Sequence, residues 1–490
     1  MLRLKIMLAA ALLLSIFCGC GQARLTPEAE PDSVKVSPQL RTADGASTIV
    51  PGHFVIIYSD GRAPAPYSSA TATLNPSDVQ ARALDDDATF TRLSTVPGVD
   101  FVLRDRYVEG HQISSPGNPN LPIDPNQPDS FYRSSQNWAV LQAGGYGAGV
   151  PGGPTFGPWD RTQGAGIRIA ILDSGVDVTH PDIAPNLALS LTEVDTTALP
   201  TPCDDGTPQD QQGHGTWTAS LATGAAGPGT GGVIGVAPQA TLLNIKVLER
   251  IPTSAGAQCT TSQAAGLLSW VLLGINDAVT HKADIVSLSL GSVVDLQSGD
   301  GAGWKAAFDR ATHAASAAGV VVIAAVGNDA LDLSGTGANP ARYIELPAQA
   351  RYVLPVVAAT NPACAESLAP NAACAPGPVT RPFYSNFGVS LNAIAAPGGS
   401  FPNVSESGVN GWIRGACSMS GCFNLGPSAY VQAMGTSASA PLVAGAAALL
   451  RATHPHWNAE QTINALRLSA SHSGSMQEPQ LNTGAALTLP

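Results

Sequence analysis

Four residues with the chemistry of an activated nucleophile occur in short turns that contain glycine. Asp173 begins Asp-Ser-Gly, His214 lies in Gly-His-Gly-Thr, and Ser437 lies in Gly-Thr-Ser-Ala. Asn328 follows a glycine at the end of an apolar run. A serine hydroxyl attacks a carbonyl carbon only when a neighbouring base takes its proton, and an imidazole does this best when a carboxylate orients it. An amide N–H can then stabilise the oxyanion that forms.

Each of these residues has a plainer interpretation on its own. Asp-Ser-Gly and Gly-Asn are ordinary turn sequences, a single histidine often serves at a surface or helix end, and serine is a favoured helix N-cap. If the four turns were unrelated, an acid, a base, an alcohol and an amide would each have to occur at the end of an element by coincidence. We therefore predict that the four side chains meet at one site.

The segments before these residues predict a parallel sheet. From residue 167 onward, short apolar runs that favour strands buried on both faces alternate with longer helical stretches. This alternation indicates an α/β fold, in which functional side chains gather beyond the carboxyl ends of the strands. The expected strands cover residues 167–172, 242–248, 285–290, 320–326 and 353–358, and the expected helices cover 261–281 and 304–318.

The stretch after Ser437 predicts a buried helix. Residues 439–450 are almost all Ala, Gly, Val, Leu and Pro, so this helix has no polar face. We expect Pro441 within the first turn, where a missing N–H costs nothing. Ser437 would then lie beside free backbone N–H groups at the positive end of the helix, which favours an oxyanion.

The chain order Asp, His, Ser, with the amide between the last two, resembles the subtilisin-like serine peptidases over roughly residues 136–469. The resemblance implies a three-layer α/β sandwich with a mainly parallel central sheet. It also implies a serine endopeptidase in which Ser437 is the nucleophile, His214 the general base and acid, and Asp173 the group that orients the imidazole. Asn328 and the Ser437 backbone N–H would form the oxyanion hole.

Two further stretches resemble the substrate-binding walls of that family. Ser289-Leu290-Gly291 has the ending of the edge strand with which an extended protein or peptide substrate pairs, and Gly291 would leave room for the substrate backbone. Ala325 and Gly327 would lie in the opposite wall of the primary pocket. An ordinary buried strand that ends in a turn is the plainer interpretation of the first stretch.

Residues 49–110 resemble the small α/β propeptide of the family, which templates folding of the catalytic domain and then occupies its cleft. The catalytic domain would then span residues 111–490 and begin with an exposed connector rich in Pro, Asn and Gly. We expect strands at 53–58 and 99–103, a helix at 78–86, and the connector at 114–129.

The chain departs from the family pattern at two places. Trp217 stands where the family often has histidine, which predicts different packing beneath the catalytic helix. The glycine-rich stretch 225–233 lacks the asparagines that often build a calcium loop in relatives. Asp182 could serve as one calcium ligand, but a single carboxylate is a poor site. Calcium is therefore a possible cofactor, and no other cofactor is expected.

The composition and the first residues predict an exported protein. The net charge of −12 offers no basic patch, which excludes nucleic acid as a partner. Residues 1–20 have the layout of a secretory signal peptide, with an apolar run too short to cross a bilayer. Cys20 also resembles a lipidated first residue, which would tether the protein to a membrane, and a fully released form is the alternative. Residues 21–48 are expected to be a linker.

Apart from Cys18 and Cys20, six cysteines remain, and an even number in an exported chain indicates disulfides. About fifteen pairings are formally possible. Closeness in sequence favours Cys364 with Cys374 and Cys417 with Cys422, which leaves Cys203 with Cys259. A zinc site is the weaker alternative because the cysteines lack close Cys-x-x-Cys pairs and neighbouring histidines.

Two other functions are compatible with the same four residues. A peptide transferase or macrocyclase would pass the acyl group to an amine instead of to water. An inactive binding protein that retains the fold would have lost at least one of the four polar groups, and this chain keeps them all. We therefore predict a serine endopeptidase, made as a precursor and secreted or held at the cell envelope.

Overall fold

The structure is a computed structural model of the 490-residue chain. The expected signal peptide apart from residues 7–8, the linker up to residue 47, the helix expected at 78–86 and the connector up to residue 127 lie outside the described residues. Described are residues 7–8, 48–58, 91, 94–95, 99–111, 128–148, 156–196, 203–252, 259, 262–335, 342–367, 369, 373–401, 410–422, 429–472 and 474–490.

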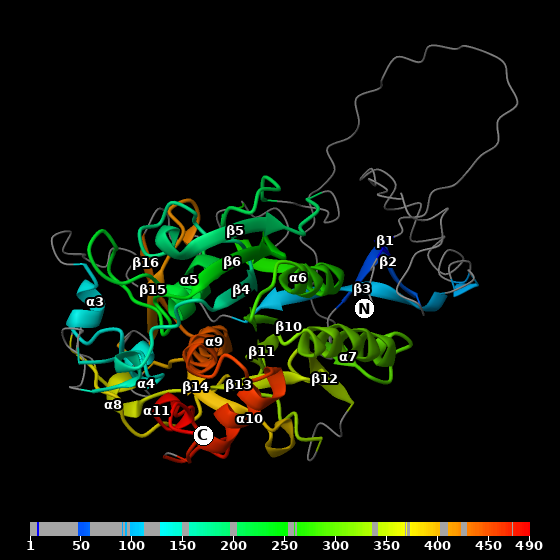
Figure 1. The fold of residues 1–490 in the computed structure, drawn as a ribbon. Helices are drawn as coiled ribbons and strands as arrows, with labels where there is room; N and C mark the ends of the chain where they lie inside the picture. Colours follow the sequence, from blue (N-terminus) through cyan, green and yellow to red (C-terminus); the bar gives the residue numbers. More distant parts are fainter. Residues whose placement is uncertain are drawn as a thin grey trace, which may run out of the picture.

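Within these residues, seven parallel strands form the central sheet (Figure 1). Their order across the sheet is β14 (Ile394–Pro397), β13 (Val353–Ala359), β11 (Val321–Ala325), β9 (Ile285–Leu288), β4 (Arg168–Asp173), β6 (Thr241–Lys246) and β5 (Leu187–Thr192). Five of these strands are formed by the apolar runs that predicted strands. Side chains that follow one another in a strand point to opposite faces of the sheet, and both faces are buried here, so each run is apolar throughout.

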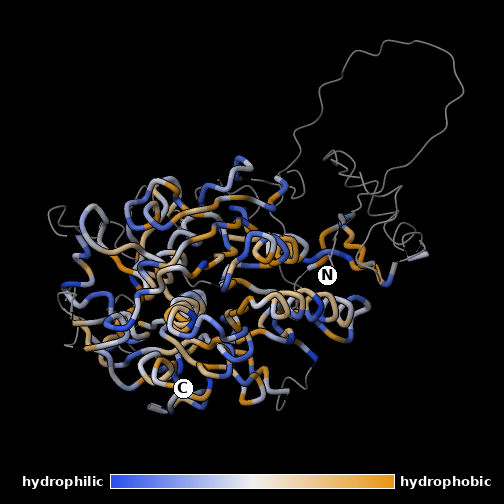
Figure 2. The backbone as a smooth tube through the Cα atoms, viewed as in Figure 1, coloured by the Kyte–Doolittle hydropathy of each residue, from blue (hydrophilic) through white to orange (hydrophobic). Residues whose placement is uncertain are grey.

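Helices cover both faces of this sheet. Ile169 and Ile171 of β4 face a core shared with three helices, whereas Ala170 and Leu172 face a second core shared with the other two. The first group comprises α5 (His214–Thr223), α9 (Thr436–Thr453) and α10 (Ala459–Ser469), and the second comprises α6 (Leu268–Thr280) and α7 (Gly301–Ala317). Figure 2 shows hydrophobic segments gathered in the interior and hydrophilic ones in the outer loops. The predicted three-layer α/β fold is therefore confirmed.

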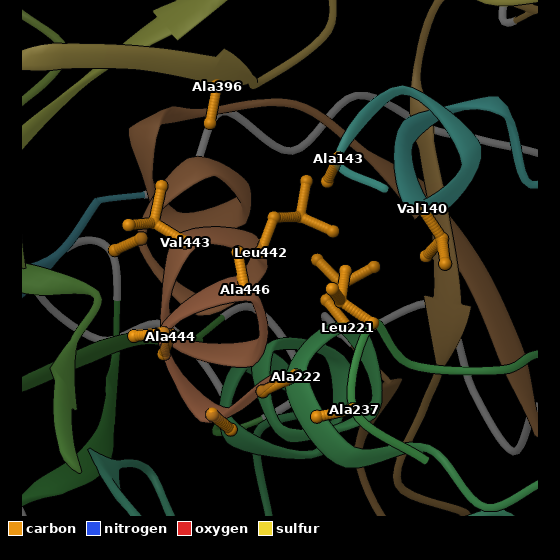
Figure 3. Close-up of a cluster of buried hydrophobic side chains, with 14 of the residues drawn as sticks. Val140, Ala143, Leu221, Ala222, Ala237, Ala396, Leu442, Val443, Ala444 and Ala446 are labelled. Carbon is orange, nitrogen blue, oxygen red and sulfur yellow. The ribbon is translucent and has the colours of Figure 1, made fainter. Parts of the chain in front are cut away.

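Helix α9 is buried along almost its whole length, as predicted. Leu442 and Ala446 lie against Leu221 and Ala222 of α5 (Figure 3). Small residues permit this close approach, since a Cβ added to Gly445 of α9 would lie 3.1 Å from the Ala222 carbonyl oxygen of α5.

The position of Pro441 in α9 was predicted wrongly. It is the sixth residue of the helix, beyond the first turn, so its missing N–H leaves the carbonyl of Ser437 without a helical donor. The Ser289 hydroxyl donates to that carbonyl oxygen instead, at 2.8 Å. The proline is tolerated because a side chain from another element supplies the lost hydrogen bond.

A second, antiparallel sheet joins the N-terminal segment to the rest of the molecule (Figure 1). Its strands are β1 (Met7–Leu8), β2 (Ile49–Tyr58), β3 (Val99–Gly110), β10 (Leu290–Asp295), β12 (Tyr343–Leu346), β7 (Leu248–Pro252) and β8 (Ser262–Leu267). The other α-helices and strands of the described residues are a small hairpin of β15 (Ile413–Ala416) and β16 (Tyr430–Ala433) and the short helices α3 (Ser130–Arg133), α4 (Trp138–Gln142), α8 (Pro362–Ala365) and α11 (Thr483–Ala486).

Three expected elements were predicted wrongly. The strand expected at 99–103 continues to Gly110 as β3, because its second half pairs with β8 and β10. The stretch expected as one helix over 261–281 begins as β8, because these residues pair with β3 on one side and β7 on the other, and the helix starts only at Leu268. Gly266 suits this position, since an added Cβ would lie 2.2 Å from the Val247 carbonyl oxygen. The strand expected over 285–290 divides at Ser289, where the chain passes from the parallel sheet to the antiparallel one.

The three favoured disulfides are present. The Cα atoms of Cys203 and Cys259 lie 5.6 Å apart, and those of the other two pairs lie 5.6 and 5.4 Å apart, within the range that a disulfide spans. Within the described part of the chain, no helix combines the length and hydrophobicity that crossing a bilayer requires.

Candidate active site

Asp173 and His214 form a buried hydrogen-bonded pair at the carboxyl end of β4, in the middle of the central sheet. Asp173 is the last residue of β4 and His214 the first of α5, and Nδ1 of the imidazole lies 2.6 Å from Oδ1 of the carboxylate. Thr218, one turn along α5, donates its hydroxyl to the other carboxylate oxygen at 3.0 Å. Because a carboxylate only accepts, Nδ1 donates, and Nε2 of the neutral ring is left as an acceptor.

Ser437 is the second residue of α9 and lies against the end of the N-terminal segment. Its backbone N–H donates to the carbonyl oxygen of His111 at 3.0 Å, and its hydroxyl donates to the carbonyl oxygen of Ser289 at 3.2 Å. The preceding residue of that segment, Gly110, lies beside His214, since a Cβ added there would be 3.3 Å from the imidazole Cε1. The His214 imidazole and Ser437 therefore lie beside two consecutive residues of that segment, Gly110 and His111.

Asn328 lies just beyond β11 with a fixed side-chain orientation. Its Oδ1 accepts from both the backbone N–H and the hydroxyl of Thr436, each at 2.9 Å. The Nδ2 atom is buried and has no hydrogen-bond partner among the described residues. Thr436, the residue before Ser437, holds the amide oxygen of Asn328. The Nδ2 group at the other end of this amide therefore points away from Thr436, and its N–H groups are available to donate to another acceptor.

Residues 107–110, at the end of β3, lie between two other strands. On one side Gly110 pairs with Leu290 and Glu109 with Gly291 of β10, and the His111 N–H donates to the Ser289 carbonyl oxygen at 3.0 Å. On the other side the segment pairs with β8. The edge expected to bind an extended peptide is thus occupied by the chain itself.

The His111 side chain lies beside Gly291 and Glu345, and Gly327 lies beside Glu345 and Asn386. We call these neighbours of His111 the His111 site: Gly291, Gly327, Glu345 and Asn386. His111 Nε2 lies 3.1 Å from Glu345 Oε1, and their side chains are 2% and 0% exposed. Gly327 has a φ of 98°, which favours glycine, and a Cβ there would lie 3.3 Å from Glu345 Oε2. Ala325, expected in the same wall, packs instead in the core beneath α9.

A sequence model of the Subtilase family matches residues 164–485, about two thirds of the chain, with the acid, base, amide and serine inside it. The chain belongs to the subtilase family. It is 34% identical over 174 residues to an intracellular serine protease of Paenibacillus polymyxa, which covers 35% of this chain and 44% of the relative. It is 28% identical over 313 residues to subtilisin E of Bacillus subtilis, which covers 64% and 62%.

This subtilase therefore spans less than two thirds of the length of these two curated relatives. Among solved structures, its fold is similar to that of the epidermin leader peptide processing serine protease of Staphylococcus aureus, with a TM-score of 0.58 at 21% identity, which covers 82% of this chain and 88% of the other. The nisin leader peptidase of Lactococcus lactis has a TM-score of 0.53 at 20% identity and covers 73% and 94%. These structures support the fold.

Several residues at the site of this subtilase could not be found from local sequence. Asp210 is fully buried and accepts hydrogen bonds from Ser174, Gly213 and Thr216, which fixes the turn after β4 against the start of α5. Burial raises the pKa of Asp210. Glu345 likewise carries no motif, because only long-range strand pairing brings it to His111. Trp217, the departure from the family pattern, donates its indole N–H to the Ile413 carbonyl oxygen at 3.2 Å.

The glycine-rich stretch 225–233 is held by carboxylates. Asp182 accepts from the backbone N–H groups of Gly231 and Val233 and from the Tyr430 hydroxyl. Burial raises the pKa of Asp182 to about 7. These donors do not fit a calcium site, because their hydrogens face the oxygens that a cation would need. No group of three or more His, Cys, Asp or Glu side chains within the described residues could hold a metal ion.

Proposed function

We propose that this subtilase is a secreted serine endopeptidase that is made as a precursor and cleaves its own chain after His111. One observation supports this most strongly. The imidazole that is paired with Asp173 lies beside Gly110, while the Ser437 N–H donates to the His111 carbonyl oxygen. These contacts support a reaction in which a nucleophile, a base and a hydrogen-bond donor act on the same peptide carbonyl.

In the proposed reaction, Ser437 Oγ attacks the carbonyl carbon of His111 and forms a C–O bond, while its proton passes to His214 Nε2. The C–N bond to Gln112 then breaks, and the imidazolium gives the proton to the departing amine. Water attacks the ester in the same way and releases the His111 carboxylate. Asp173 holds the imidazole in the tautomer whose Nε2 can accept that proton.

The negative charge that develops on the carbonyl oxygen needs donors that are already in position. The Ser437 N–H is one, at 3.0 Å, and we assign the Asn328 Nδ2 as the other. Losing such a donor costs about 3 kcal/mol of transition-state stabilisation, a magnitude established for subtilisin. Asn328→Ala should therefore lower kcat by about 100- to 1,000-fold.

We infer that residues 49–111 act as the propeptide and stay bound after cleavage, which moves the expected boundary one residue beyond 110. Support comes from β3, which pairs along its length with β2, β8 and β10 and ends at the His111 carbonyl. The three disulfides and the signal-like layout of residues 1–20 support export. Lipidation of Cys20 would tether the enzyme to the cell envelope.

Fluorophosphonate labelling of the purified protein tests the proposal, together with mass spectrometry of the processed N-terminus. We expect labelling of Ser437 and a mature chain that begins at Gln112. Ser437→Ala should abolish both labelling and processing. Ser439→Ala is the matched control, because Ser439 lies on the same helix and donates to Ala396 and Pro397. A folded wild-type protein that neither labels nor matures would overturn the proposal.

A further inference from the structure

The pairing of His111 with Glu345 points to a preference for the side chain at the cleaved bond. We propose that Glu345 selects substrates that carry a basic residue immediately before the cleaved bond, and that His111 is the first such residue the enzyme meets. This rests on the proposed function, which makes His111 the residue before that bond.

Glu345 is held in place by the same strand that holds the substrate backbone. It lies in β12 opposite Val293 of β10, and β10 also pairs with Gly110 and Glu109. Gln349 fixes both backbone groups of Glu345. The Glu345 N–H donates to the Gln349 side chain, and the Glu345 carbonyl oxygen accepts from the Gln349 N–H, each at 2.8 Å. The carboxylate is therefore placed at a constant distance from the edge on which substrates would lie.

The His111 site is built for a charged group that is removed from water. The His111 imidazole and the Glu345 carboxylate are both buried, and a buried carboxylate is costly unless a donor or a cation faces it. Nearby, Asn386 keeps a fixed amide orientation, because its Nδ2 donates to Val326 and its Oδ1 accepts from Asp329 and Leu331. An apolar side chain in place of His111 would remove the nitrogen that lies 3.1 Å from Glu345 Oε1.

Two glycines provide the room that a basic side chain needs. A Cβ at Gly291 would lie 1.9 Å from Glu345 Oε1 and 2.3 Å from His111 Cε1. At Gly327 an added Cβ would lie 2.5 Å from Asn386 Nδ2. Only hydrogen atoms in these two places allow an imidazole or a guanidinium stem to pass between the walls and reach the carboxylate.

The test uses processed enzyme from which the cleaved residues 49–111 have been removed, and fluorogenic peptides with the chain's own sequence Tyr-Val-Glu-Gly before a variable residue of His, Arg, Leu or Glu. We expect kcat/KM for His or Arg to exceed that for Leu by about 10- to 100-fold, with Glu the poorest. Glu345→Gln should lower the ratio of Arg to Leu by at least about tenfold, and Glu345→Arg should make Glu the best of the four. Glu460→Gln, at an exposed position of α10, is the matched control and should leave the ratio unchanged.

Processing of the precursor gives a second readout if a Glu345 variant matures poorly. His111→Arg should process, and His111→Glu should slow processing. In the Glu345→Gln background, His111→Leu should process at least as fast as His111. Wild-type enzyme that labels with fluorophosphonate yet cleaves Leu as well as both His and Arg would overturn this inference alone, whereas enzyme that does not label would overturn the proposed function.

Discussion

Replacing Gly291 with alanine should slow processing of the precursor without unfolding it. The added methyl would lie 1.9 Å from Glu345 Oε1 and 2.3 Å from His111 Cε1, where ordinary contacts begin at about 3.4 Å. The φ of Gly291 is outside the left-handed region, so its backbone suits alanine and the penalty is steric. Overpacking of this kind costs about 1–3 kcal/mol, which corresponds to roughly 5- to 150-fold in rate.

The assay is the time course of precursor cleavage, followed by mass spectrometry. Gly299→Ala is the matched control, because a Cβ at Gly299 meets nothing within 4 Å. Thermal unfolding of both variants in the uncleavable Ser437→Ala background separates a blocked site from a damaged fold. If Gly291→Ala matures within about twofold of the wild-type rate, the residues around His111 are not packed as the structure has them.

Three further predictions concern the surroundings of the site. Thr218→Val removes a hydroxyl donor to Asp173 and should lower kcat about tenfold with little change in KM. Burial raises the pKa of Asp182 to about 7, so the folded chain holds this proton more tightly than the unfolded chain does. The free energy of unfolding should therefore fall as pH rises from about 4 to 7. Asp182→Asn should make the free energy of unfolding depend less on pH over this range. Removing the Cys203 disulfide, whose partners are 56 positions apart in the sequence, should cost about 4 kcal/mol, against about 2 kcal/mol for the Cys417 disulfide, whose partners are 5 positions apart.

Each of these has a control or a contradicting result. Thr223→Val removes a hydroxyl on the same helix that donates only to the Ala219 carbonyl, and its kcat should match wild type. Urea unfolding of the Ser437→Ala precursor across the pH range measures the Asp182 effect, and parallel curves for wild type and variant would contradict it. Equal stability losses on removing the long and the short disulfide would show that loop closure does not govern their contributions.

The parts of the fold that sequence predicted are those in which neighbouring residues decide the structure. Five central strands follow from runs of apolar residues, and α9 follows from a run of small ones, because burial on all sides needs no distant partner to be recognised. The extent of β3 and the identity of β8 could not be found this way. Residues 262–267 read as helix, and only pairing with β3 and β7 makes them a strand.

The residues of the candidate site also differ in whether local sequence predicts them. Asp173, His214, Asn328 and Ser437 could be predicted, because each lies in a turn that contains glycine at the end of an element. Glu345 does not, because it becomes relevant only when β12 pairs with β10 and β10 pairs with the N-terminal segment. Residues whose position depends on two successive strand pairings leave no local pattern, and the preference that we propose for Glu345 depends on such a residue.

Ser289 links substrate binding to the proposed nucleophile. Its carbonyl oxygen accepts from both the His111 N–H and the Ser437 hydroxyl, and its own hydroxyl donates to the Ser437 carbonyl that Pro441 leaves free. The contact from the Ser437 hydroxyl is the longest of the three, at 3.2 Å, so rotation about one side-chain bond can redirect that proton towards His214 at little cost. When a strand binds at Ser289, the backbone of Ser437 is therefore already fixed by Ser289. Only the Ser437 hydroxyl must still rotate before it can attack.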